Sequence, residues 1–392
     1  MPWQTSSPMS KRQEFIDALL SGRTPFRQLC AEFGVSAKTG YKWRERFRVG
    51  GPAALVDGSH APRCPAHQVP RDVRESILAL REAHPTWGAR KLKARLAQQQ
   101  PTTVWPAPST ITEVCKRAGL VAPRRRRDPA QSRWATPHLT TPDAPNRVWA
   151  TDFKGEFRLR SGHYCYPLTV TDGYSRFLLG CDALSSTAFV TAQAAFTVLF
   201  QAFGLPECMR SDNGVPFAQP MALGGLSRLS VWWIRLGIRP ERIRKGTPTQ
   251  NGAHERMHRT LKAEATQPEG TLDAQQRRFT QWQHEYNHER PHEALGQTPP
   301  AAHYVRSERP WPKRLPPLHY AADAAVRSVD SSGSIYFRNR PISLSTTLTG
   351  EVVALTEQPE DRWQIRFGPL QLGHYVAIDD TFEPALTWLT PH

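Results

Sequence analysis

The sequence has no run of about eighteen apolar residues, the length that an α-helix needs to cross a membrane. It also has no C-x-x-C pair, and we see no secretion signal. The six cysteines are scattered along the chain, at Cys30, Cys64, Cys115, Cys165, Cys181 and Cys208. We therefore expect no membrane span and a protein that works in a reducing cytoplasm.

A zinc-type metal cluster is missing as well. The nearest approach to one is the group His60, Cys64 and His67, which lacks both a fourth ligand and the usual zinc spacing. We interpret these three side chains as ordinary loop residues.

Acidic residues are scarce relative to basic ones. The 392 residues include 51 Lys and Arg against 35 Asp and Glu, which gives a formal net charge of +16. Residues 1–145 hold 24 of the basic and 11 of the acidic residues, so +13 of that charge belongs to the N-terminal part. Such a field favours a polyanion such as nucleic acid as the partner. The length predicts two to four domains in series.

Residues 1–60 read as a helical domain with two breaks. Thr24 and Pro25 have the chemistry of a cap followed by a first-turn proline, and the turn 33–36 ends one helix and caps the next with Ser36. The last of these helices is crowded with basic residues, among them Lys38, Lys42, Arg44 and Arg46. This pattern predicts a helix-turn-helix domain with a DNA-reading helix.

Residues 61–123 predict a second unit of the same kind. Val73, Ile77 and Leu80 have helical spacing, and the helix expected over 89–96 carries Arg90 and Lys91. A further short helix is expected from a cap at Ser109 to Arg117. Two such units suit a long DNA end, which needs more contacts than one small module offers. The alternative is a helical bundle whose charges face water.

Residues 124–145 read as a basic, Pro-rich linker. It opens with Arg124, Arg125, Arg126 and Arg127. This block would suit a phosphate backbone, and a solvated run of charge is the alternative.

From residue 146 to about 310 the pattern changes to strands alternating with helices. Strands are expected over 148–153, 164–171 and 177–181, followed by a helix over 187–203 and a strand ending at Asp212. A helix near 226–236, a short strand near Ile238 and a helix from about Asn251 complete a mixed α/β order.

Three carboxylates in this region predict a metal site. Asp152 ends the first strand, Asp212 ends the fourth, and Glu255 lies one turn into the helix opened by Asn251-Gly252. Carboxylates beside buried strands need a cation or a partner. An all-oxygen set of this kind suits Mg²⁺, or Mn²⁺ as its substitute, and two such ions would support phosphoryl transfer without a covalent protein intermediate.

Two basic residues follow Glu255 on the same helical face. Arg259 and Lys262 lie four and seven residues further along the chain. Cations in these positions would hold DNA phosphates beside the metal ions. The alternative is a surface helix with incidental ion pairs.

Residues 147–265 resemble the integrase catalytic core of bacterial insertion-sequence transposases and retroviral integrases, the DDE superfamily. The matching motifs are Trp149-Ala150-Thr151-Asp152, Ser211-Asp212-Asn213-Gly214 and the segment 249–256 that ends in Glu255-Arg256. The segment 286–292, Tyr-Asn-His-Glu-Arg-Pro-His, resembles the segment after the core in bacterial members. The resemblance implies an RNase H-like fold in which Asp152, Asp212 and Glu255 are both catalytic residues and metal ligands.

The stretch between Asp212 and Glu255 is longer than in the most familiar members, with the excess around 221–230. Glu241 and Glu264 are therefore rivals for the third carboxylate, although neither follows an Asn-Gly helix opening. Asp172 precedes a glycine and reads as turn chemistry.

Residues 318–392 return to short strands separated by glycines, which suggests a small β-barrel resembling the one after the core of several transposases. Arg338 and Arg340 could contact DNA there. A barrel used for protein contacts is the alternative. The fold class expected for the whole chain is multidomain α/β, with helix-turn-helix units, an RNase H-like core and this barrel.

Together these features predict a bacterial, nucleoid-associated DNA transposase that recognises terminal inverted repeats, nicks DNA and joins the freed 3′-hydroxyl to a target. A homodimer or larger assembly is expected because two DNA ends must be held together. The alternative is a domesticated DNA-binding regulator that has lost catalysis. A tyrosine or serine recombinase would need a protein nucleophile in an arginine-rich pocket, which the sequence does not offer. A nonspecific RNase H-type nuclease has little use for DNA-reading units.

Overall fold

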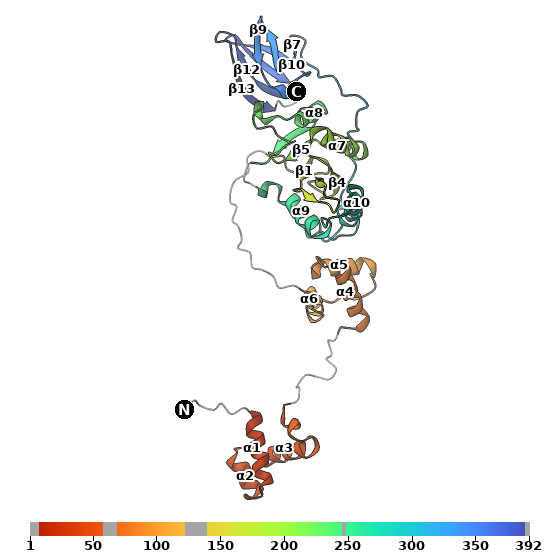
Figure 1. Ribbon diagram of the computed structural model, residues 1–392, viewed down its shortest axis with the longest axis vertical. Helices are drawn as coiled ribbons and strands as arrows, with labels where there is room; N and C mark the ends of the chain where they lie inside the picture. The colour runs from red at the N-terminus through yellow and green to blue at the C-terminus, as the bar shows by residue number, and fades with distance from the viewer. Residues whose placement is uncertain (1–7, 58–68, 122–138, 245–247, 389–392) are drawn as a thin grey trace. The chain divides into compact units, whose positions relative to one another are not determined.

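The computed structural model describes residues 8–57, 69–121, 139–244 and 248–388 (Figure 1). The chain forms two compact units, Met1–Pro70 and Arg71–His392. The predicted loop group at 60, 64 and 67 and the arginine block 124–127 lie outside the described residues. Within the described residues, no helix is both long and apolar enough to span a membrane.

The first unit is a small helical domain. Its elements are α1 (Pro8–Leu20), α2 (Phe26–Glu32), α3 (Ala37–Gly50) and the short helix η1 (Pro52–Leu55). Ser36 caps α3 as predicted, because its side chain accepts a hydrogen bond from the Thr39 amide. The predicted cap of α2 at Thr24 was one residue too early. The N-cap residue is Pro25, and no side chain caps this helix. A Cβ atom at Gly40 would lie 2.6 Å from Cys30 Sγ, so glycine permits the close crossing of α2 and α3.

A three-helix group opens the second unit. It consists of α4 (Arg71–Ala83), α5 (Ala89–Gln99) and α6 (Pro108–Arg117). Each helix buries residues at helical spacing, such as Val73 and Ile77 of α4 and Leu92 and Leu96 of α5. The predicted cap at Ser109 was wrong, since α6 begins at Pro108 and no side chain caps it.

A mixed β-sheet follows. Its strands are β1 (Val148–Phe153), β2 (Phe157–Arg158), β3 (Tyr164–Asp172), β4 (Leu178–Leu184), β5 (Cys208–Ser211) and β6 (Arg239–Arg242). The order is β2-β3-β1-β5-β6, with β4 also paired to β3. β3 runs antiparallel to both β1 and β4. β5 runs parallel to both β1 and β6. This strand order agrees with the RNase H-like fold predicted from the sequence.

Helices cover the two faces of this sheet. The helices are α7 (Phe189–Phe203), α8 (Arg228–Arg235), α9 (Gly252–Glu264) and α10 (Leu272–His288). Side chains of α7 and α8 share one apolar core with Trp149, Leu168 and Val170. Side chains of α9 and α10 share another with Cys165 and Leu178. Because strand side chains alternate between faces, Asp152 lies on the face opposite Trp149, with α9.

The C-terminal strands form two sheets. The strands are β7 (Ala325–Ser328), β8 (Ser334–Phe337), β9 (Arg340–Ser343), β10 (Val352–Gln358), β11 (Arg362–Phe367), β12 (Leu370–Val376) and β13 (Thr381–Trp388). One sheet has the order β13-β12-β11-β10-β7, and the other is the hairpin β8-β9. The prediction of a closed barrel is therefore wrong. Among the described residues, β13 does not pair with β7, and neither of these edge strands pairs with the β8-β9 hairpin.

The long stretch between Asp212 and Glu255 anchors these C-terminal sheets to the core. Leu226, Val231 and Ile234 belong to the same apolar core as the C-terminal strands. The Arg235 guanidinium pairs with the Glu351 carboxylate at 2.6 Å. The extra length around 221–230 thus supplies a docking surface for the last domain and leaves the sheet order of the core unchanged.

Candidate active site

The strand register places Asp152 and Asp212 side by side. β1 pairs with β5 in parallel, with Ala150 opposite Arg210. Asp152 and Asp212 each lie two residues further along these neighbouring strands, so they point to the same face. Neighbouring strands are about 4.8 Å apart. Two carboxylates thus meet at the carboxyl ends of β1 and β5.

Glu255 reaches the same region from α9. Its side chain is exposed in the first turn of that helix. The pKa of Asp152 is raised to about 7, first by burial and then by the negative charges of Asp212 and Glu255. The three carboxylates are therefore close enough to act on one another electrostatically. In the described part of the chain, no three His, Cys, Asp or Glu side chains surround a common point at metal-ligand distance.

None of the three carboxylates is neutralised by a basic side chain. Among the described residues, no Lys or Arg lies within ion-pair distance of them. Asp212 accepts a hydrogen bond from the Gly214 amide at 3.0 Å, which orients its carboxylate. The ring atom Nδ1 of His258 lies 3.5 Å from Asp152 Oδ2. Burial lowers the pKa of His258 to about 2, so its ring is neutral and adds no compensating charge.

A buried polar cluster holds α9 against β3 beside this site. The Thr169 hydroxyl lies 2.9 Å from His254 Nε2 and 2.6 Å from His258 Nε2. It also donates to the backbone oxygen of Asp152 at 3.1 Å. The Thr171 hydroxyl lies 2.8 Å from His254 Nδ1. These histidines were not predicted as part of the site, although their spacing of four residues on α9 puts them on one face.

The rival acidic residues are engaged elsewhere. Glu241 is buried and pairs with Arg210 at 3.0 Å, and the Thr140 hydroxyl also donates to it. Glu264 accepts two hydrogen bonds from Arg290, each 2.8 Å long, and one from Trp282 Nε1 at 2.7 Å. Both carboxylates are thereby bound into the fold, which leaves Glu255 as the unpaired glutamate near the two aspartates.

Asp172 has the structural role that its sequence context predicted. It is buried in the turn after β3, and its carboxylate accepts hydrogen bonds from the Asn146 amide and from the amide and hydroxyl of Ser175. These contacts close the turn.

The cations predicted to read DNA lie in three places. On α3, Lys38, Lys42 and Arg44 are exposed, and Arg46 is half-buried with its guanidinium over the Trp43 ring. On α9, Arg259 and Lys262 are exposed on the side of Glu255, without an acidic partner among the described residues.

The α5 cations differ from these, because the fold already uses one of them. Arg90 of α5 pairs with Glu293 at 2.7 Å, both side chains being largely exposed. Lys91, the next residue, makes no ion pair among the described residues and is half-buried. It lines a pocket beside the core sheet.

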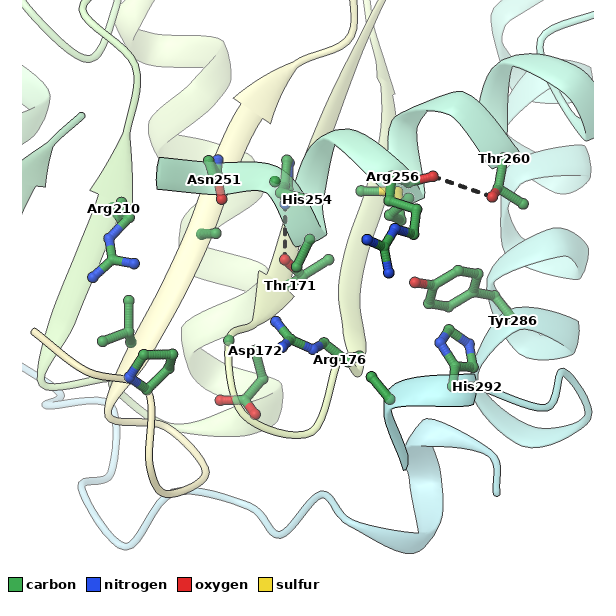
Figure 2. A pocket seen from close by; sticks show the side chains of 18 of the residues that line it. Thr171, Asp172, Arg176, Arg210, Asn251, His254, Arg256, Thr260, Tyr286 and His292 are labelled. Carbon is green, nitrogen blue, oxygen red and sulfur yellow. Dashed lines mark hydrogen bonds between the residues drawn. The ribbon is translucent and has the colours of Figure 1, made fainter. Parts of the chain in front are cut away.

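This basic pocket lies beneath the start of α9 (Figure 2). Its volume is about 500 Å³. Five cationic side chains line it, from α5, the β3–β4 turn, β5, α9 and the segment after α10: Lys91, Arg176, Arg210, Arg256 and Arg290. Only Lys91 among these was predicted from the sequence as a DNA contact. The sequence signal that could have pointed to this pocket is the motif 286–292, because its Tyr286, Arg290 and His292 all line the pocket.

Comparison with family models agrees with this architecture. Two integrase core domain models match residues 142–248 and 236–300. A helix-turn-helix domain model matches residues 11–63, and a homeodomain-like domain model matches residues 39–115.

Curated relatives include viral and bacterial proteins. An insertion element IS407 protein of 31.7 kDa from Burkholderia multivorans is 28% identical over 193 residues, which cover 49% of this chain and 66% of that protein. The Gag-Pol polyprotein of baboon endogenous virus is 28% identical over 201 residues, 49% of this chain and 11% of the polyprotein. The chain thus spans just under two thirds of the first relative and a small part of the second.

Solved structures with a similar core have low sequence identity. The magnesium-bound HTLV-2 integrase catalytic core domain is 14% identical with a TM-score of 0.33, over 41% of this chain and 98% of that one. A chain of a simian T-cell lymphotropic virus intasome is also 14% identical, with a TM-score of 0.37 over 81% of this chain and 99% of that one.

Proposed function

We propose that this chain is an active DNA transposase of the DDE transposase and integrase family, with Asp152, Asp212 and Glu255 as its catalytic residues. The observation that carries the proposal is the proximity of these three carboxylates without a basic partner at ion-pair distance among the described residues, whereas Glu241 and Glu264 are held in ion pairs. Uncompensated carboxylates are the natural ligands of hard divalent cations.

The donor set fits Mg²⁺ or Mn²⁺. All three side chains offer oxygen. Burial and the negative charges of Asp212 and Glu255 raise the pKa of Asp152, and bound cations would offset this cost. The exposed side chain of Glu255 is free to change rotamer toward the two aspartates. Two such ions would activate the attacking oxygen and stabilise the leaving oxygen of the scissile phosphodiester.

The chain's own residues have distinct tasks in this reaction. The Gly214 amide and the Thr169–His258 cluster hold the two aspartates in position. Arg259 and Lys262, on the same face of α9 as Glu255, bind the phosphates that flank the scissile one. The first step is hydrolysis that frees a 3′-hydroxyl at the end of the element. The second is attack of that hydroxyl on target DNA, which joins the strands without a covalent protein intermediate.

DNA recognition belongs to the helical units before the core. The basic side chains on α3, with Lys38 and Lys42 exposed along one face, supply contacts to the terminal inverted repeats. We propose that the protein acts as a homodimer or a larger assembly on DNA, because two element ends must be joined in one reaction.

Strand cleavage and strand transfer on a labelled duplex with the element's terminal repeats would test this function. The assay compares Mg²⁺, Mn²⁺ and EDTA, and compares wild type with Asp152→Asn and with the exposed control Asp323→Asn. We expect metal-dependent products that vanish in Asp152→Asn alone, while DNA binding persists in all three proteins. DNA binding without products in any of them would identify a regulator instead.

A further inference from the structure

We propose that the basic pocket beneath the start of α9 is a second DNA contact, which holds a phosphodiester of the strand being cut. The inference rests on the proposed function, because it assigns another part of the same substrate to a site outside the catalytic carboxylates.

The first argument is charge that the protein leaves unpaired. Arg210 and Arg290 form ion pairs with Glu241 and Glu264 and are satisfied by them. Lys91, Arg176 and Arg256 line the same pocket and have no acidic partner at ion-pair distance among the described residues.

The two acids in the lining, Glu293 and Asp172, offset the charge of these cations only in part. Glu293 pairs with Arg90, and the Asp172 carboxylate is satisfied by hydrogen bonds within its own turn. The pocket therefore carries net positive charge and is partly shielded from water. An anion is the ligand that best compensates such a charge.

The cations also repel one another. The pKa of Lys91 is lowered to about 8, first by burial and next by the charge of Arg290. Burial and the neighbouring Arg256 lower the pKa of Arg176 as well. A phosphate oxygen between these groups would relieve both costs.

The turn between β3 and β4 positions Arg176. Arg176 has a φ of 64°, in the left-handed region, and its amide donates a hydrogen bond to the Asp172 backbone oxygen at 3.0 Å, which closes the turn. Figure 2 shows its guanidinium turned into the space beneath α9, toward the same cavity as Arg256.

Uncharged polar groups complete the lining. The Tyr286 side chain is buried and lines the pocket. Burial raises its pKa to about 12, so it remains a proton donor. His292 Nε2 is buried and has no hydrogen-bond partner in the described part of the chain. Unsatisfied buried atoms are costly, and a ligand in the pocket would satisfy them.

The position of the pocket suits a strand that also reaches the carboxylates. Val148 and Ala150 line the pocket, and they share one face of β1 with Asp152. The distance from them to Asp152 along the strand is roughly 7 to 13 Å, at about 3.3 Å per residue. At about 3.4 Å per nucleotide, a DNA strand covers that distance in two to four phosphates. The volume of about 500 Å³ also accommodates a phosphodiester with its flanking sugars.

The experiment measures DNA binding by the full chain in EDTA, so that it is independent of catalysis. Fluorescence anisotropy with a labelled duplex, repeated between about 50 and 200 mM salt, gives the dependence of log K on log salt concentration. The variants are Arg176→Asn, Arg256→Gln and their combination. Arg278→Gln is the control, because Arg278 on α10 lies outside the pocket and pairs with Glu269 at 2.8 Å.

Arg176→Asn is a safe substitution, since asparagine tolerates the left-handed conformation. We expect each single variant to reduce the salt slope by about one and the double variant by about two, with thermal stability unchanged or raised. The charge-conserving Arg256→Lys should keep most of the slope. The Arg278→Gln control should keep all of it.

A double variant that folds normally and has the slope of the wild type would overturn the proposal. A second arm titrates inorganic phosphate against a thermal melt at matched ionic strength. Stabilisation of the wild type by millimolar phosphate, with an unchanged DNA slope in the variants, would mean that the pocket serves free phosphate and would also overturn it. The cleavage assay of Asp152→Asn reports separately on the proposed function, so the two can fail independently.

Discussion

The carboxylate site and the basic pocket lie on one face of the same sheet, under the same helix, with opposite charge. Glu255 and Arg256 are consecutive residues of α9, yet one acts on the pKa of Asp152 and the other lines the pocket. Buried histidines and threonines separate the two regions. Both regions contain charges that the protein leaves unpaired, and in both we assign the missing counter-charge to a ligand.

Four other charges in the core form two ion pairs. Arg210 with Glu241 and Arg290 with Glu264 are buried ion pairs between segments far apart in sequence. The contrast teaches that residue type alone does not identify a functional charge. The same glutamate or arginine is structural where the fold gives it a partner, and is available to a ligand where the fold does not.

The largest effect should come from Glu255→Gln. Loss of an unpaired carboxylate at the site should lower strand cleavage by about a thousandfold, equivalent to about 4 kcal/mol, because charge stabilisation in the transition state is lost. The melting temperature should stay within about 2 °C of the wild type, since Glu255 has no partner to lose. Cleavage that survives at more than a tenth of the wild-type rate would remove Glu255 from the triad.

The same isosteric change at the paired glutamates should have the opposite outcome. Glu241→Gln and Glu264→Gln each leave a buried arginine without its counter-charge, which should cost about 3 kcal/mol of unfolding free energy. Denaturant titration measures this loss. The fraction that remains folded should still cleave DNA, and a folded Glu264→Gln protein without activity would contradict the distinction between paired and unpaired acids.

The amino-acid sequence predicted only part of this distinction between paired and unpaired charges. The bounds of β1 were predicted to the residue, and Asp152 and Asp212 lie at strand ends as expected, because strand patterns and their punctuation are local. The basic pocket was missed because its cations come from five separate segments, which only tertiary packing brings together.

Two other features of the fold depend equally on long-range contacts. No helix was predicted over α10, although Phe279, Trp282 and Tyr286 recur at helical spacing. The C-terminal region was correctly predicted to form short strands, although β9 and β13 were missed, and barrel closure depends on which edges pair, which no local pattern specifies.

A third prediction concerns the cost of the carboxylate cluster when no metal is added. The pKa of Asp152 rises from its ordinary 3.8 to about 7 in the folded protein. The folded state therefore holds this proton more tightly than the unfolded state, and the stability that it contributes is full below about pH 4 and lost as the pH rises to about 7.

Asp152→Asn removes the ionisable group and, with it, this loss of stability as the pH rises. In EDTA at pH 8, its unfolding free energy should exceed that of the wild type by roughly 2 kcal/mol, since each pKa unit corresponds to about 1.4 kcal/mol and the side chain is 29% exposed. The difference should disappear below about pH 4. An equal difference at both pH values would show that ionisation of the Asp152 side chain is not its cause.

The smallest effect extends the comparison to the first helical unit. On α3, Lys42 is exposed without an acidic partner among the described residues, whereas Arg48 pairs with Glu45 at 2.6 Å. If unpaired cations are the ones that contact DNA, Lys42→Gln should reduce the salt slope of DNA binding by about one. Arg48→Gln should reduce it by less than half as much, because a side chain held by Glu45 gives up that pair before it can contact a phosphate. Equal slopes for the two variants would show that, at an exposed helix surface, pairing in the free protein does not determine which cations bind DNA. The rule drawn from the core would then apply only where burial makes an unpaired charge costly.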